Sequence, residues 1–283
     1  MLRAIDILNI KAMAMGRALI KASMAIKTGK RKTPNGMVIY NGPSVLEPDV
    51  NIVVIMTGLE HGTSNKKTGD MVQTWILRED IKPSEASKTG QDVAICGDCP
   101  HRRSQGGGCY VDPGKAPQSI WKAYKKGNYP TVTPKDAAVL LAGMWVRFGS
   151  YGDPSAVPLK VWNPIVLTAK KRSGYTRQWK RFDVKQWGFL MASTMTEEET
   201  IEAQAMGWRT FRIRSVNADL MPDEIDCPSA RDDSLMPITC AACNLCEGRD
   251  FEKKRTAKSI TIEVHGFNPY IERFEKQVAA IAA

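Results

Sequence analysis

Apolar residues near the N-terminus recur at three- and four-residue steps, which is the spacing of one face of an α-helix. The residues with this spacing are Ile5, Leu8, Ala12, Met15, Leu19 and Ala22. The pattern predicts a helix that ends before the basic run Lys30-Arg31-Lys32 and the loop-forming run Thr33-Pro34-Asn35-Gly36. We therefore divide the chain into a basic N-terminal helix with its linker, residues 1–36, and an α/β domain, residues 37–283.

Charged residues interrupt the apolar pattern of the N-terminal segment. They are Arg3, Asp6, Lys11, Arg17, Lys21 and Lys27. A secretory signal needs an uninterrupted apolar stretch, so this segment does not fit one, and an organelle transit peptide is the weaker alternative. Two interpretations of the helix stay open. It packs on the domain with its basic face in water, or it is an arm that contacts nucleic acid.

Short β-rich runs alternate with helical stretches along the rest of the chain. The predicted strands are 51–56, 72–77, 93–96, 145–148, 174–177, 189–192, 210–213 and 259–264. The predicted helices are 117–126, 134–142, 197–206 and 270–282. Alternation of strand and helix is typical of a parallel sheet. The predicted fold is therefore α/β, either a (β/α)8-like barrel or an open parallel sheet, with cysteine-rich insertions.

The seven cysteines are concentrated in two parts of the sequence. The first group is Cys96, Cys99 and Cys109, and the second is Cys227, Cys240, Cys243 and Cys246. Two residues between cysteines allow both thiolates to bind one ion, whereas core cysteines would be scattered through strands. We predict that both groups bind metal, in one or two sites. Core packing or a redox pair is the alternative.

The choice of metal stays open between iron–sulfur and zinc. The second group supplies four thiolates, and its CxxCxxC run resembles that of ferredoxins, which favours an iron–sulfur cluster. Zinc also accepts four cysteines. The first group supplies three thiolates. Either His101 completes a zinc site, or His101 points to solvent and a coordination position stays open for substrate or water.

Several polar residues follow predicted strands, in places that share one rim of a parallel sheet. Because ligand sites are built at that rim, we expect these residues to converge with the first cysteine group. Tyr151, Asp153 and Tyr175 are the candidate catalytic acid, base or nucleophile. Arg147 and Arg214 are candidates for binding an anion.

A segment in the second half of the chain alternates basic and aromatic residues. Its candidate nucleic-acid-binding residues are Lys170, Lys171, Arg172, Arg177, Trp179, Lys180 and Arg181. Basic side chains can follow phosphates while aromatic rings stack on bases. The whole chain has 40 Lys and Arg against 30 Asp and Glu, a net charge of +10, which favours an anionic partner. DNA is therefore the expected partner.

Composition narrows the class of protein. Hydrophobic residues make up 43% and charged residues 25% of the chain, the balance of a folded globular protein. No run of about 18 apolar residues occurs, so no membrane partner is expected and the predicted location is the cytoplasm. There, a reducing environment disfavours disulfides and favours metal binding by the cysteines. His61, His101 and His265 lie far apart, so the paired histidines of tyrosine-dependent nicking enzymes are missing.

Eight segments carry a resemblance to a known family. They are residues 40–45, 67–74, 96–100, 151–154, 174–176, 207–211, 227–228 and 240–246. The chain resembles a family encoded by tailed bacteriophages and prophages, whose members often carry the label of rolling-circle replication protein. That label implies DNA nicking by a tyrosine. The resemblance implies a phage protein that acts on DNA during replication in the cytoplasm of a bacterial host.

Three hypotheses follow from these observations. The first is a phage-type metal-binding protein that acts on DNA. The second is an iron–sulfur α/β-barrel enzyme that modifies a nucleobase or a small metabolite. The third is a non-catalytic DNA-binding module stabilised by zinc.

Overall fold

The computed structural model describes residues 4–28, 34–62, 67–230, 238–249 and 258–282. Within these residues, nine strands form one sheet in the order β1-β2-β3-β4-β5-β6-β7-β9-β8. The strands are β1 (Gly36–Pro43), β2 (Asn51–Thr57), β3 (Val72–Arg78), β4 (Trp145–Tyr151), β5 (Lys171–Thr176), β6 (Met191–Thr194), β7 (Thr210–Arg214), β8 (Glu224–Asp226) and β9 (Ser259–Glu263).

The sheet is mixed, mostly parallel and open. β1 pairs with β2 and β2 with β3 in antiparallel fashion, and the pairs from β3 to β8 are parallel. β1 and β8 lie at opposite edges of the sheet. The predicted α/β class and the open sheet are therefore confirmed, with an antiparallel edge that was not predicted. The described strands do not close into the alternative barrel.

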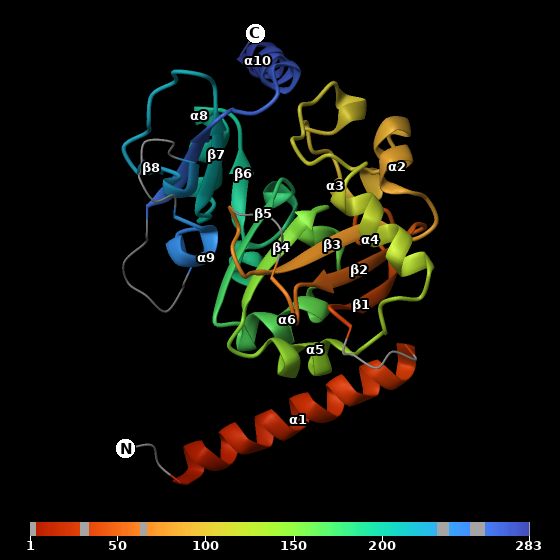
Figure 1. Cartoon of the computed structure of the whole chain (residues 1–283). Coiled ribbons are helices and arrows are strands. Elements are labelled where there is room, and N and C mark those ends of the chain that lie inside the picture. Colours follow the sequence, from red (N-terminus) through yellow and green to blue (C-terminus); the bar gives the residue numbers. More distant parts are fainter. Residues whose placement is uncertain (1–3, 29–33, 63–66, 231–237, 250–257, 283) are drawn as a thin grey trace.

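Helices cover both faces of the sheet. They are α1 (Ala4–Thr28), α2 (Pro83–Thr89), α3 (Val93–Cys96), α4 (Ala116–Lys125), α5 (Pro134–Leu141), α6 (Leu159–Thr168), α7 (Val184–Trp187), α8 (Glu197–Ala205), α9 (Cys240–Cys243) and α10 (Asn268–Ala282). Figure 1 shows α5 and α6 on one face and α3 and α4 on the other. The predicted N-terminal helix is present, and it lies at the far end of the molecule from α10 (Figure 1).

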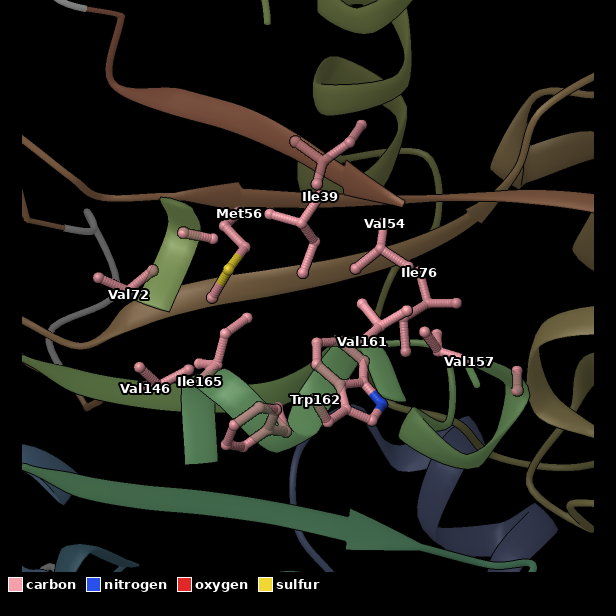
Figure 2. Packing of buried hydrophobic residues seen from close by; sticks show 14 of the residues in the cluster. Ile39, Val54, Met56, Val72, Ile76, Val146, Val157, Val161, Trp162 and Ile165 are labelled. Atoms are coloured by element: carbon pink, nitrogen blue, oxygen red, sulfur yellow. The ribbon is translucent and has the colours of Figure 1, made fainter. Parts of the chain in front are cut away.

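The main core lies between the sheet and α6. Figure 2 shows Ile39, Val54 and Ile76, from three neighbouring strands, facing Trp162 of α6. Trp162 is fully buried, and its indole N–H donates a hydrogen bond to the carbonyl of Pro154 at 2.9 Å. Its ring meets that of Phe148 edge to face, with ring centres 5.2 Å apart. This packing fixes β4, the strand that leads into the candidate site.

A basic residue attaches α1 to the rest of the protein. The Arg17 guanidinium donates hydrogen bonds to the carbonyls of Val139 and Ala142, at the C-terminal end of α5. A cation is stabilised there because carbonyl groups at the end of a helix carry partial negative charge. Met24, two turns further along α1, is buried.

One predicted strand is wrong. Residues 93–96 form the short helix α3, in which the N–H groups of Cys96 and Gly97 donate to the carbonyls of Asp92 and Val93. The physical reason is that both edges of β3 and β4 are already paired, which leaves no edge for another strand there. Ala94 and Ile95 are buried by the helical turn instead.

No helix in the described ranges has the length and hydrophobicity that crossing a membrane requires.

Candidate functional site

A cavity of about 180 Å³ lies where the parallel strands end. Its wall includes Asp153, which follows β4, and Tyr175, Ser193, Ile213 and Ile262 from β5, β6, β7 and β9. Ligand sites of open α/β sheets lie at this carboxyl edge. The expectation that polar residues after the strands converge there holds for Asp153 and Tyr175.

The first cysteine group lines this cavity, which we call the cysteine pocket. Cys96, Cys99 and Cys109 all contribute to its wall. Cys96 ends α3, and the loop then folds back so that the Cys109 N–H donates to the carbonyl of His101 at 2.9 Å. Burial raises the pKa of Cys99 to about 12 and raises that of Cys96, which also lies close to Cys99 and Cys109. The neutral thiols are therefore favoured unless a cation binds among them.

Two buried side chains hold the cysteine-bearing loop in place. The Arg102 guanidinium donates to the Asp92 carboxylate at 2.8 Å and to the carbonyl of Gly97 at 2.9 Å. The Gln178 amide donates to the carbonyl of Cys96 at 3.2 Å and to Asp98 at 2.6 Å. Arg102 belongs to the loop itself, whereas Gln178 follows β5, so a local and a long-range contact together fix the positions of Cys96 and Cys99.

Gly97→Ala is expected to destabilise this loop. Gly97 has φ +60°, and a Cβ there would lie 2.6 Å from the Gln178 amide. We expect a loss of about 1–3 kcal/mol in the free energy of unfolding from backbone strain, with an added cost from the displaced amide. The matched control is Gly127→Ala, at φ +68° with open space around the position. Thermal unfolding of both variants tests the prediction, and equal shifts would show that contact with Gln178 has no role.

His101 is buried beside the first cysteine group. Its ring stacks on Phe274 of α10 with centres 5.9 Å apart, and it lines the cysteine pocket. Burial lowers the pKa of His101 to about 4, so the ring is neutral. Its Nε2 atom is buried and has no hydrogen-bond partner among the described residues. The alternative that His101 points to solvent is wrong, and a buried nitrogen without a partner is suited to a ligand.

Asp153 connects the ends of two strands. Its carboxylate accepts hydrogen bonds from the N–H and hydroxyl of Ser155, from the hydroxyl of Thr176 and from the Arg177 N–H, at 2.8 to 3.1 Å. Burial raises its pKa, and these bonds oppose the rise. The arrangement positions β4 against β5, and a role for Asp153 as catalytic acid or base stays a prediction.

Tyr151 is not among the residues that line the cysteine pocket. Burial raises the pKa of Tyr151 well above its usual value, and the nearby Cys96 adds to the effect. Its hydroxyl is buried without a hydrogen-bond partner among the described residues. A neutral phenol is therefore the stable form, which makes Tyr151 a poor nucleophile at neutral pH.

The second cysteine group surrounds a separate, much smaller cavity of about 20 Å³. All four cysteines of the group line it, and we call it the four-cysteine cavity. Its volume is about that of one water molecule, so it has room for a single small ion. Cys240 and Cys243 come from α9, whose N-cap Thr239 accepts a hydrogen bond from the Ala242 N–H at 3.2 Å.

Backbone hydrogen bonds join three parts of the chain at the four-cysteine cavity. The Cys240 N–H donates to the carbonyl of Lys67 at 2.8 Å, which attaches α9 to the loop before β3. The Cys227 N–H donates to the carbonyl of Thr261 at 2.8 Å, which attaches the end of β8 to β9. The cavity therefore lies at a junction of segments far apart in sequence.

Tyr175 lies between the two cysteine groups. It lines both the cysteine pocket and the four-cysteine cavity, and its side chain lies close to Cys246. Burial raises the pKa of Tyr175 well above its usual value, so it too is a neutral phenol. The Arg147 guanidinium lies 5.9 Å from the Tyr175 ring centre.

The cysteines share cavities without forming a preassembled metal site. In the part of the chain that the structure describes, no three Cys, His, Asp or Glu side chains are placed as ligands of one ion. The donor chemistry nevertheless fits two kinds of centre. Four thiols around a small cavity suit a structural ion, and three thiols with an unpartnered imidazole nitrogen suit a centre with an open position.

Several candidate nucleic-acid-binding residues are paired within the chain. Ion pairs join Lys171 to Glu247 at 2.9 Å, Arg177 to Glu199 at 2.7 Å and Lys180 to Glu202 at 2.6 Å. Trp179 is 1% exposed, so its ring belongs to the core and has no surface on which a base could stack. The exposed cations Lys170 and Arg181 have no ion pair among the described residues.

The remaining predicted arginines differ in their environment. Arg214 pairs with Asp226 at 3.0 Å and with Glu263 at 2.9 Å, so its charge is balanced. Arg172 has a buried Nε without a hydrogen-bond partner among the described residues, beside the four-cysteine cavity. Arg147 is partly buried and has no ion pair with a described carboxylate.

Comparison with protein-family models, with curated proteins and with solved structures finds no match to this chain. The site is therefore interpreted from its geometry. Sequence reasoning missed Arg102 and Gln178, which hold the cysteine loop, and Phe274, which stacks on His101. No local pattern could have found Gln178 and Phe274, because their partners lie far away in the sequence. Arg102 bonds to Asp92 and Gly97, ten and five positions before it.

Proposed function

We propose that the protein is a thiolate–metal protein that acts on DNA by binding a single base in the cysteine pocket. The observation that carries the proposal is a cavity of about 180 Å³ at the carboxyl ends of parallel strands, lined by three cysteines. A protein cavity of about 150 Å³ accommodates one benzene ring. Enzymes that modify a base bind it outside the base stack in a pocket of this kind.

The first cysteine group and His101 would hold the reactive centre, with a coordination position facing the pocket. When bound, zinc would supply Lewis-acid chemistry and an iron–sulfur cluster would supply redox chemistry. The chain itself provides an apolar wall that excludes water, from Phe211, Ile213 and Phe274. A planar ring is the ligand that packs best against such a wall.

DNA is proposed over a small metabolite on two grounds. The net charge of +10 favours a polyanion, and the resemblance to the phage family points to DNA replication as the setting. The competing hypothesis, an iron–sulfur enzyme acting on a small metabolite, is supported by the internal pairing of Lys171, Arg177 and Lys180. The same experiment separates the two.

The test uses protein purified without oxygen and a short single-stranded DNA that contains 2-aminopurine, whose fluorescence rises when it leaves the base stack. We expect binding that weakens steeply with salt, together with a rise in fluorescence. Ile213→Trp fills the pocket and should weaken this response at least tenfold. Ile201→Trp, at a position 58% exposed on α8, is the control and should respond like the unaltered protein.

Two results would overturn the proposal. One is an absence of DNA binding at low salt, and the other is an unchanged fluorescence response in Ile213→Trp. Metal analysis and the visible spectrum of the same sample assign the centre. Iron with broad absorbance near 400 nm supports a cluster, and colourless protein with stoichiometric zinc supports zinc.

A further inference from the structure

A second, larger cleft adjoins the cysteine pocket. Its volume is about 570 Å³, and Tyr110 and Val111 belong to the walls of both cavities. Thr57 at the end of β2, Gln73 of β3 and Arg147 of β4 form one side. A ligand seated in the cysteine pocket can therefore extend past Tyr110 into this side cleft.

The side cleft contains a cation whose charge is not balanced by a carboxylate. Arg147 lines the cleft and pairs with no acid among the described residues, and Tyr110, whose hydroxyl lies close to the guanidinium, lines the same cleft. Lys115, the residue before α4, adds a second positive charge to the lining of the cleft. The acid in the wall, Asp112, already accepts the Gly114 N–H at 2.8 Å and lies 3.8 Å from Lys115.

Taken together, these features favour an anionic ligand. A partly buried arginine without a carboxylate partner is costly unless an anion accompanies it. The thiols of Cys240 and Cys246 lie near Arg147, but no cysteine lies in the wall of the side cleft. Arginine is also the side chain best suited to phosphate, because its planar donors can bind two oxygens at once.

We propose that the side cleft binds the phosphate of the nucleotide whose base lies in the cysteine pocket. This inference rests on the proposed function, because it takes the base to lie beyond Tyr110. Arg147 binds the phosphate oxygens directly, and Lys115 contributes a second positive charge to the cleft lining. The cleft thereby selects a nucleotide over a free base or nucleoside.

The test uses deoxyribose 5-phosphate, a probe without a base, so that it reports on the side cleft alone. Calorimetry should detect binding of deoxyribose 5-phosphate and none of deoxyribose. Lys115→Gln combined with Ser119→Glu should weaken binding at least tenfold, because the new carboxylate lies in the cleft wall and repels phosphate. The fold is preserved, because an acid in the first turn of α4 suits the helix dipole.

The control is Lys122→Gln, which removes an exposed lysine of α4 outside the cleft wall and should leave binding unchanged. Arg147→Gln is a second variant, and its metal content is measured alongside because Cys240 and Cys246 lie nearby. Equal binding of deoxyribose and its phosphate, or full binding by the Lys115→Gln/Ser119→Glu protein, would overturn the inference.

The base-binding proposal and the phosphate-binding proposal can be contradicted independently of each other. If deoxyribose 5-phosphate binds as expected while 2-aminopurine gives no response, the phosphate cleft stands and the base pocket is wrong. If the base response is normal and the sugar phosphate does not bind, the phosphate cleft is wrong. Competition by a short oligodeoxynucleotide then shows whether the phosphate belongs to a strand or to a free nucleotide.

Discussion

Glu224→Gln is expected to lower the thermal unfolding temperature strongly, because it breaks a buried ion pair. Arg212 and Glu224 side chains are 3% and 0% exposed, and two hydrogen bonds join them at 2.8 and 2.6 Å. Removing one partner of such a pair leaves a buried charge and costs about 3–5 kcal/mol. For a domain of this size, the unfolding temperature should fall by roughly 6–20 °C.

The pair matters for the site because of where it lies. β9 lies between β7 and β8 in the sheet, so Arg212 of β7 reaches across β9 to Glu224, the first residue of β8. Cys227 follows β8 directly. The ion pair therefore holds the edge strand that presents one member of the second cysteine group.

The control for Glu224→Gln is an exposed pair of the same type. Lys180 and Glu202 lie 2.6 Å apart with side chains 55% and 49% exposed, so Glu202→Gln should cost less than about 1 kcal/mol. A double replacement, Arg212→Met with Glu224→Leu, should recover most of the lost stability, because two apolar side chains leave no buried charge. Equal shifts for Glu224→Gln and Glu202→Gln would contradict the prediction.

Local patterns predicted most elements and missed those whose structure depends on distant neighbours. The apolar runs of β2, β3, β4 and β9 have β-branched residues, and their positions agree with the prediction. The run 93–96 has a similar composition, yet it forms α3 because the strands nearest to it, β3 and β4, are already paired on both sides. A short apolar run is consistent with either structure, and only the rest of the fold decides between them.

The candidate site was predictable in its parts and not in its arrangement. Cysteine spacing indicated which thiols lie together, because two intervening residues constrain the chain locally. It could not show that Tyr175 lies between the two groups, since that depends on how β5 is placed in the sheet. The pattern of basic and aromatic residues failed, for a related reason, to predict which cations are free to bind nucleic acid. Lys171 finds its carboxylate 76 positions away in the chain, so the sequence could not show that its charge is paired.

Cys240→Ser combined with Cys243→Ser is expected to remove one metal equivalent and to destabilise the protein. The four-cysteine cavity joins α9, the loop before β3 and the end of β8, so an ion bound there stabilises contacts between segments far apart in sequence. Structural zinc contributes about 10–16 kcal/mol of binding free energy in isolated zinc-binding peptides. Some of this binding free energy is coupled to global unfolding. Its loss in the variant should appear as a large fall in the unfolding temperature.

Cys99→Ser is the matched comparison, because the first cysteine group lines a pocket of about 180 Å³ rather than a cavity of about 20 Å³. It should remove the other metal equivalent and abolish the response to the base, with a small change in stability. Metal analysis and thermal unfolding, with and without a chelator, distinguish the two centres. The chelator should lower the unfolding temperature of the unaltered protein to that of the Cys240→Ser/Cys243→Ser protein and leave the latter unchanged. Full metal content in that double variant would show that the second group is not a metal centre.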